Sequence, residues 1–206
     1  MSTRLVDFAG YDQALREALS RITQGNVREH RARIRALQSR HNHAISLVEE
    51  AGELPYHCVR YAFDLIDLPG NIRKAIDHLE SWRRQRQLPR LDPLDTVFVN
   101  FLIEQRRVLH GRNSAESGSI IVYLGEERVQ HVGKIQGELV NSKWNNLGHL
   151  WQHRIYEVPI GYGADVRFFE SLPRDEAVPQ LLSFIEVIRA APTPPKHKQL
   201  RERLHH

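Results

Sequence analysis

Short runs of β-branched and aromatic residues, separated by brief turns, fill residues 118–169. Turns of a few residues join antiparallel neighbours, whereas parallel strands need a crossover of a dozen residues or more. This block therefore predicts an antiparallel meander. We expect its strands over 119–124, 128–136, 138–144, 154–159 and 166–169.

The chain before this block has helical periodicity. Over residues 8–50 apolar side chains recur at three- and four-residue spacing, which predicts helices. Gly25-Asn26 should break this run into two helices, with Asn26 capping the second. Further helices are expected over 56–67, 71–87 (capped by Asn71), 94–109 and 178–190.

Helices together with an antiparallel sheet define an α+β fold, in which one helix can pack across the sheet. The 206 residues suffice for one domain with additions. We expect an N-terminal helical extension over 1–50, a main domain over 51–191 and a basic tail over 192–206.

Composition limits the class of protein. An apolar content of 41% with 26% charged residues is typical of a soluble globular chain, and no run is long enough to span a membrane. Residues 1–7 contain no apolar signal core. We therefore expect a cytoplasmic protein, or one exported by a route that does not use a signal peptide.

The chain contains one cysteine, Cys58, in a turn that leads into an apolar helix. It cannot form an intramolecular disulfide, and a helix N-terminus would lower its pKa and favour the nucleophilic thiolate. The alternative interpretation is a small buried apolar residue. About seventy residues later, His131 stands near the start of a predicted strand.

Five short motifs follow one another within residues 54–163. They are Tyr56-His57-Cys58-Val59-Arg60-Tyr61-Ala62, Gly118-Ser119-Ile120-Ile121-Val122-Tyr123, His131-Val132-Gly133, Asn141-Ser142-Lys143-Trp144 and Val158-Pro159-Ile160-Gly161-Tyr162-Gly163. In this order they resemble the papain-like cysteine peptidases and amidases of the NlpC type, especially their uncharacterised bacterial relatives. Two residues depart from that pattern: Ser119 stands where these families usually have aspartate, and Val59 where they often have a small polar residue.

The resemblance implies that Cys58 is the nucleophile, favoured as a thiolate by a nearby imidazolium, and that His131 is its base and acid. It places a third group, which orients the imidazole, on the next strand. Asn141 and Ser142 face opposite sides of that strand, so only one can serve, and we choose Ser142. The rivals are His149 and His153.

Two further roles follow from the same resemblance. The oxyanion donors would be the Cys58 backbone N–H and a side chain just before it, Tyr56 or His57. Gly133 would let the strand backbone pass close to the cysteine helix, where a side chain would obstruct it.

His149 and His153 stand four residues apart and could bind zinc on a helix, with His131 as a third ligand. However, no acidic residue lies between them, and the segment leads into β-rich sequence. The chain also has no phosphate-binding or dinucleotide-binding glycine loop. We therefore expect neither a metal nor a cofactor.

Together these features predict a cysteine hydrolase or acyl-transfer enzyme that acts on an amide bond through a thioester. Its partner would be a peptide or another amide-containing substrate. The resemblance points to cell-wall peptide, which suits a peptidoglycan amidase or endopeptidase, or a bacterial effector; a cytoplasmic amidase, deamidase or peptidase is equally open. The N-terminal helices could bind a protein partner.

The alternative is a non-catalytic binding module that uses the basic helix at 28–40 to bind nucleic acid or a protein. Acidic residues are interleaved in that segment and aromatic residues are absent from it, which favours an ordinary solvated face. We therefore expect no nucleic-acid partner and no membrane partner.

Overall fold

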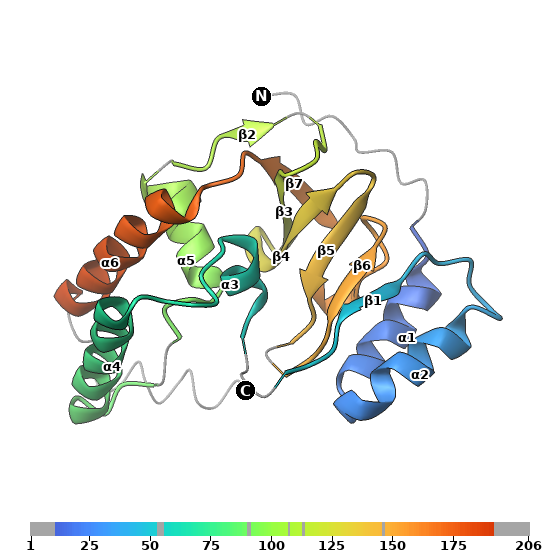
Figure 1. Ribbon diagram of the computed structural model, residues 1–206, viewed down its shortest axis with the longest axis horizontal. Coiled ribbons are helices and arrows are strands. Elements are labelled where there is room, and N and C mark those ends of the chain that lie inside the picture. Colours follow the sequence, from blue (N-terminus) through green and yellow to red (C-terminus); the bar gives the residue numbers. More distant parts are fainter. Residues whose placement is uncertain are drawn as a thin grey trace.

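A computed structural model describes residues 11–52, 56–89, 92–106, 108–112, 114–145 and 147–191. A seven-stranded antiparallel sheet runs through the molecule. Helices α1 and α2 lie on one side of it, and the remaining α-helices lie on the other (Figure 1). The α+β fold with an antiparallel sheet, predicted from the sequence, is confirmed.

The strand order is β1-β6-β5-β4-β3-β7-β2, and every pairing is antiparallel. The four consecutive strands from β3 to β6 are neighbours, and the first three of them are the first three strands of the predicted meander. The strands are β1 (Ser46–Glu49), β2 (Gly111–Arg112), β3 (Ile120–Gly125), β4 (Arg128–Gln136), β5 (Leu139–Lys143), β6 (Leu150–His153) and β7 (Asp165–Phe169).

The strand expected over 154–159 is wrong, because the chain completes β6 at His153 and then turns. The turn is held by the buried carboxylate of Glu157, which accepts the backbone N–H groups of Ala44 and Arg154. β-branched and aromatic side chains here pack inward without joining the strand ladder.

Alternation along β3 supplies both faces of the sheet. Ile120 and Val122 join the core beneath the helices α3 to α6, whereas Ile121 and Tyr123 join the core on the α1–α2 side. A strand buried on both faces reads as a continuous apolar run, as this one does.

The first two helices are α1 (Gln13–Thr23) and α2 (Val27–Leu37). Asp12 caps α1 by accepting the Leu15 N–H at 2.9 Å. Asn26 caps α2 by accepting the Arg28 N–H, as predicted. The expected helix around residues 45–48 is wrong, because this segment is β1, which pairs with β6. Short apolar runs suit either structure, and here an available strand edge decided.

The cysteine helix, α3 (Cys58–Ala62), is shorter than the predicted 56–67. Asp64 adopts a left-handed conformation, with φ of 54°, so the helix cannot continue through it. The next helix, α4 (Gly70–Gln85), begins after Pro69, so Asn71 lies inside it and does not cap it.

Residues expected to form a helix over 94–109 form α5 (Thr96–Asn100) and a π-helical segment, η1 (Phe101–Arg106). The last helix, α6 (Arg174–Ala190), begins four residues before the predicted start at 178 and packs against α4. A short 3₁₀ turn, η2 (Ile160–Tyr162), precedes β7.

Within the part of the chain that the structure describes, none of the helices has the length and apolar character needed to cross a bilayer. The expectations for residues 1–7 and for the tail over 192–206 lie outside the described residues.

Candidate active site

The thiol of Cys58 lies at an edge of β4. Pairing between β4 and β5 runs from Gln136–Leu139 only as far as Lys134–Asn141. Two residues further along β4, the backbone N–H of Val132 hydrogen-bonds the Cys58 sulfur instead. The start of α3 is therefore inserted where the two strands separate.

Burial controls the charge of this thiol. Cys58 is 9% exposed, and burial raises its pKa to about 12, helped by the negative charge of Asp95. The N–H groups of Val132, Val59 and Cys58 itself act in the opposite direction but do not outweigh burial. Burial therefore favours the neutral thiol in the resting protein and acts against the expected thiolate.

His131 projects from β4 on the α1–α2 side of the sheet, where its ring stacks on Tyr162 with centroids 3.9 Å apart. The residue is 2% exposed, and its Nε2 has no hydrogen-bond partner among the described residues. Burial, with a smaller contribution from His153, holds the pKa of His131 well below its ordinary value. The imidazole is therefore also neutral.

Cys58 therefore contacts β4 next to His131, but the two side chains lie on different sides of the strand. The sulfur meets the backbone of Val132, whereas the imidazole of the preceding residue points to the face away from α3. No hydrogen bond joins the two side chains in the described part of the structure. Tyr162 lies close to both groups: its ring stacks on His131, and its pKa is raised by burial, with a smaller contribution from Cys58.

Ser142 lies on the same face of the sheet as His131 and is fully buried. Its hydroxyl lies 2.8 Å from Nε2 of His153 and accepts the indole N–H of Trp144. The other nitrogen of His153, Nδ1, donates to the Arg154 carbonyl. Ser142 therefore belongs to a hydrogen-bonded group with His153. His131 interacts with that group electrostatically, because His153 helps to lower the pKa of His131.

The other candidates for the third group lie elsewhere. Asn141 faces the α3 side, as alternation predicts, where it bonds the Tyr61 hydroxyl and accepts from Gln152. His149 accepts the Ala51 N–H at Nδ1 and donates from Nε2 to the Val27 carbonyl. Both side chains therefore have contacts that do not involve His131.

The spacing of His149 and His153 falls at β6 and not on a helix. Both nitrogens of each ring contact a protein group. Among the residues that the structure describes, no three histidine, cysteine or acidic side chains are grouped to hold a metal ion.

The two side chains considered as oxyanion donors are both engaged. Tyr56 donates its hydroxyl to Glu49 at 3.3 Å, and the Lys143 ammonium lies 4.0 Å from its ring centroid. His57 lies 3.2 Å from the Asp92 carboxylate through Nε2. The backbone N–H of Cys58, by contrast, acts on the sulfur itself.

Gly133 permits a close approach between two strands. A Cβ at this position would lie 2.7 Å from Val140 Cγ1 and 3.1 Å from the Ser142 Cβ, both on β5. The residue therefore lets β4 and β5 pack tightly on the His131 face. The three atoms nearest to that position all belong to β5, and the expected approach to the cysteine helix is not among them.

Sequence reasoning assigned no role to Tyr162, Asp92 or Asp95, although all three bear on the site. The carboxylate of Asp92 accepts the Leu94 N–H in the turn before α5, and that of Asp95 accepts the N–H of Thr96, the first residue of α5. Tyr162 stands between two glycines in the last motif of the resemblance. That motif was the one sequence signal that pointed to a role for Tyr162.

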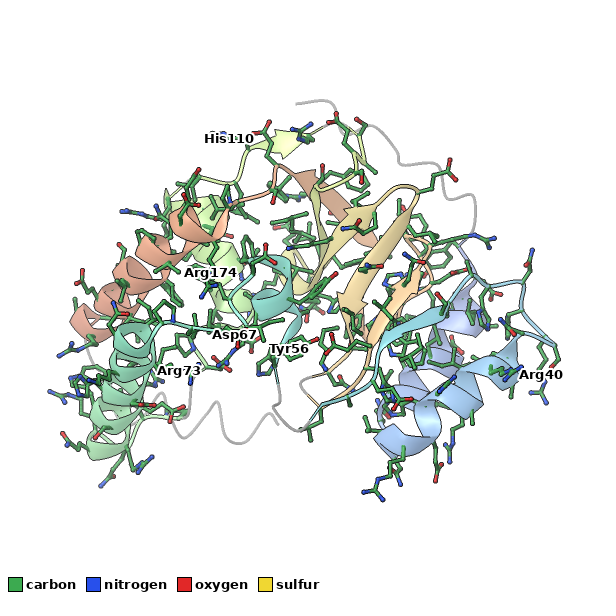
Figure 2. All side chains as sticks on the ribbon, viewed as in Figure 1. Arg40, Tyr56, Asp67, Arg73, His110 and Arg174 are labelled. Atoms are coloured by element: carbon green, nitrogen blue, oxygen red, sulfur yellow. The ribbon has the colours of Figure 1, made fainter. Side chains whose placement is uncertain are left out.

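A cavity of about 300 Å³ opens between α3 and α4. Tyr56, Asp67 and Arg73 approach one another there (Figure 2). Its charged lining residues are two arginines, Arg60 and Arg73, and two aspartates, Asp67 and Asp77. The cavity has no net charge and therefore favours neither anions nor cations.

The basic helix α2 carries its own counterions. Arg31 pairs with Glu50 at 3.2 Å, and Arg33 pairs with Glu29 one turn earlier. These pairs fit the solvated-face interpretation of the sequence.

Comparison with known proteins adds no relative to these observations. No family model matches the chain, and neither the curated proteins nor the solved structures contain a match. The candidate active site therefore rests on its own geometry.

Proposed function

We propose that the protein is a cysteine hydrolase or acyl-transfer enzyme that acts on an amide bond, with a papain-like arrangement of Cys58 and His131. The observation that carries the proposal is the insertion of the Cys58 thiol at the edge of β4, against the N–H of the residue next to His131. Such a position gives a nucleophile a fixed backbone environment and a neighbouring base.

Because the Cys58 thiol and the His131 imidazole are both neutral at rest, the thiol proton is transferred during the attack and not before it. His131 and Cys58 lie on different sides of β4 in the resting structure, so the proposed reaction requires a movement at the edge of this strand that brings the two side chains together. The unpartnered Nε2 of His131 then accepts the thiol proton as the sulfur attacks the amide carbonyl carbon. The amide C–N bond then breaks, and the amine leaves with the proton that His131 returns. Water hydrolyses the thioester and restores the thiol, or an amine accepts the acyl group.

The backbone around the sulfur supports the same reaction. The N–H groups of Cys58, Val59 and Val132 all act on the sulfur. Oriented N–H groups in a buried site stabilise negative charge that develops during attack. Burial keeps the resting thiol protonated, and the N–H groups stabilise the negative charge on the sulfur as its proton leaves.

We propose that the substrate is a peptide or another amide-bearing molecule. The first substrate to consider is cell-wall peptide, and the first biological role is that of a bacterial effector. The first test uses peptidoglycan stem peptides and a set of capped peptides, with mass spectrometry to detect amide cleavage or transfer. Wild-type protein should convert at least one substrate, and Cys58→Ala should abolish conversion while the protein remains folded.

A matched pair of histidine variants tests the base. His131→Gln should lower kcat by about 10²–10⁴-fold, the usual contribution of a general base. His110→Gln changes an exposed histidine far from the site and should leave kcat unchanged (Figure 2). Conversion that survives Cys58→Ala would refute the proposal, and the basic helix α2 would then become the feature to test for binding.

A further inference from the structure

A groove of about 410 Å³ runs between α1 and α2. Figure 1 shows this helical pair as a layer beyond the sheet, on the side away from α3 to α6. The lining of the groove combines apolar side chains with basic ones. The apolar residues are Ala18, Ile22, Ala36 and Leu37, and the basic residues are Arg21, Arg33 and Arg40.

These residues follow helical spacing, so each helix contributes one stripe to the groove. On α1 the stripe consists of a residue and those three and four positions later, and α2 repeats this spacing. Ile22 and Leu37 form the floor, since both also pack on the core beneath the helices. The three arginines are exposed, so a partner can reach them without a rearrangement of the fold.

The groove carries charge of one sign. No acidic side chain lines it among the described residues. Arg33 pairs with Glu29 at 2.5 Å, but Arg21 and Arg40 have no acidic partner in the described part of the chain. The cavity between α3 and α4 differs, because its two arginines are matched by two aspartates. The positive potential of the α1–α2 groove therefore favours an anionic partner.

The lining also limits the kind of anionic partner. Surfaces that bind single-stranded nucleic acid use aromatic side chains for base stacking, and the described lining contains none. A helix that binds in the surface of a bilayer projects large apolar side chains into it. None of the exposed large apolar residues of the described chain lies on α1 or α2. An apolar floor between basic side chains instead suits an amphipathic helix whose polar face is acidic.

We propose that the groove between α1 and α2 docks an acidic amphipathic helix of a protein partner. Its apolar side chains would lie against Ile22 and Leu37, and its carboxylates would accept hydrogen bonds from Arg21 and Arg40. Arginine suits this role because its planar guanidinium binds a carboxylate through two parallel hydrogen bonds. This interaction requires no catalysis, so it goes beyond the proposed function.

The test measures binding of a fluorescein-labelled helical peptide, with leucine on one face and glutamate on the other, by fluorescence anisotropy. The protein is the full chain carrying Cys58→Ala, so that the peptide cannot be cleaved. We expect saturable binding that weakens as salt is added. Arg21→Gln combined with Arg40→Gln should weaken binding by about tenfold or more, because both carboxylate contacts are lost. Circular dichroism should show the same melting temperature.

A matched control removes the same charge elsewhere on α2. Arg28 and Arg35 are exposed and do not line the groove, so Arg28→Gln combined with Arg35→Gln should change the affinity by less than about twofold. A second peptide, in which glutamine replaces every leucine, tests the apolar floor and should not bind.

Four results would overturn the proposal. They are the absence of saturable binding, equal binding of the leucine-free peptide, and equal weakening by the two double variants. The fourth is binding of a DNA duplex or of phosphatidylserine vesicles with the same dependence on Arg21 and Arg40, which would assign the groove to another class of partner.

Discussion

The phenol ring of Tyr162 lies flat on the imidazole of His131, with centroids 3.9 Å apart and an interplanar angle of 10°. This contact covers one face of the ring whose Nε2 has no partner in the described structure. Burial is the main cause of the low pKa of His131, and the stacked ring of Tyr162 supplies part of that burial.

Replacement of Tyr162 should therefore change the titration of His131. Tyr162→Ala admits water and should raise the pKa of His131 towards its ordinary value of 6.5, whereas Tyr162→Phe keeps the stack and should leave it low. Histidine NMR titration measures both. Equal pKa values in wild type and Tyr162→Ala would show that the strand, and not Tyr162, supplies the burial.

Ser142 should be more important for stability than its size suggests. Ser142→Ala leaves the Trp144 indole N–H and the His153 Nε2 without their shared partner. Each unsatisfied buried group costs about 1–3 kcal/mol, so the free energy of unfolding should fall by about 2–4 kcal/mol. Urea unfolding measures the change, with the exposed Ser39→Ala as the control that should change little.

Acid should destabilise the protein through His153. Burial lowers its pKa from 6.5 to about 4, so the folded state keeps the ring neutral while the unfolded state takes up a proton. The resulting stability is complete above pH 6.5 and is lost as the pH falls towards 4. A shift of this size corresponds to about 3 kcal/mol.

The measurement is the free energy of unfolding at pH 7 and at pH 4.5, in wild type and in His153→Gln. The variant should lose part of the pH dependence, and the part that remains should come from His131 and His30, whose pKa values are also lowered by burial. An identical pH dependence in the two proteins would contradict the assignment to His153.

Arg16 should connect the N-terminal helices to the site. This fully buried side chain on α1 donates from Nε to the Val158 carbonyl at 3.2 Å and from Nη2 to the Gly163 carbonyl, on either side of η2. η2 carries Tyr162, so Arg16→Met should both destabilise the protein and loosen the cover over His131.

We expect Arg16→Met to lower the free energy of unfolding by about 3 kcal/mol or more, because charge-assisted hydrogen bonds are worth about 1.5–3 kcal/mol each. It should also raise the pKa of His131 in the manner of Tyr162→Ala. Arg21→Met alters an exposed arginine of the same helix and should change stability by less than about 0.5 kcal/mol. A stability loss with an unchanged His131 pKa would separate the two roles.

Local sequence determined the elements that local chemistry can specify. The strands β3, β4 and β5 followed from β-branched runs with short turns, and the start of α2 followed from Asn26, whose side chain bonds the Arg28 N–H. The alternation that separates Asn141 from Ser142 is a property of any strand, and both residues face as predicted.

Longer-range contacts decided what these rules could not. Residues 46–49 became β1 because the edge of β6 was available, and an apolar run of that length suits a helix equally well. Likewise the turn after His153 is held by Glu157, whose carboxylate accepts the N–H of Ala44, 113 positions away.

The candidate site illustrates the same division. The sequence by itself determined that one thiol opens a helix and that a histidine lies on a later strand. Only the tertiary structure decided that Cys58 is buried and neutral and that His131 is covered by Tyr162. The reason is physical: charge state depends on desolvation and on neighbours brought together by folding, and neither is a property of local sequence.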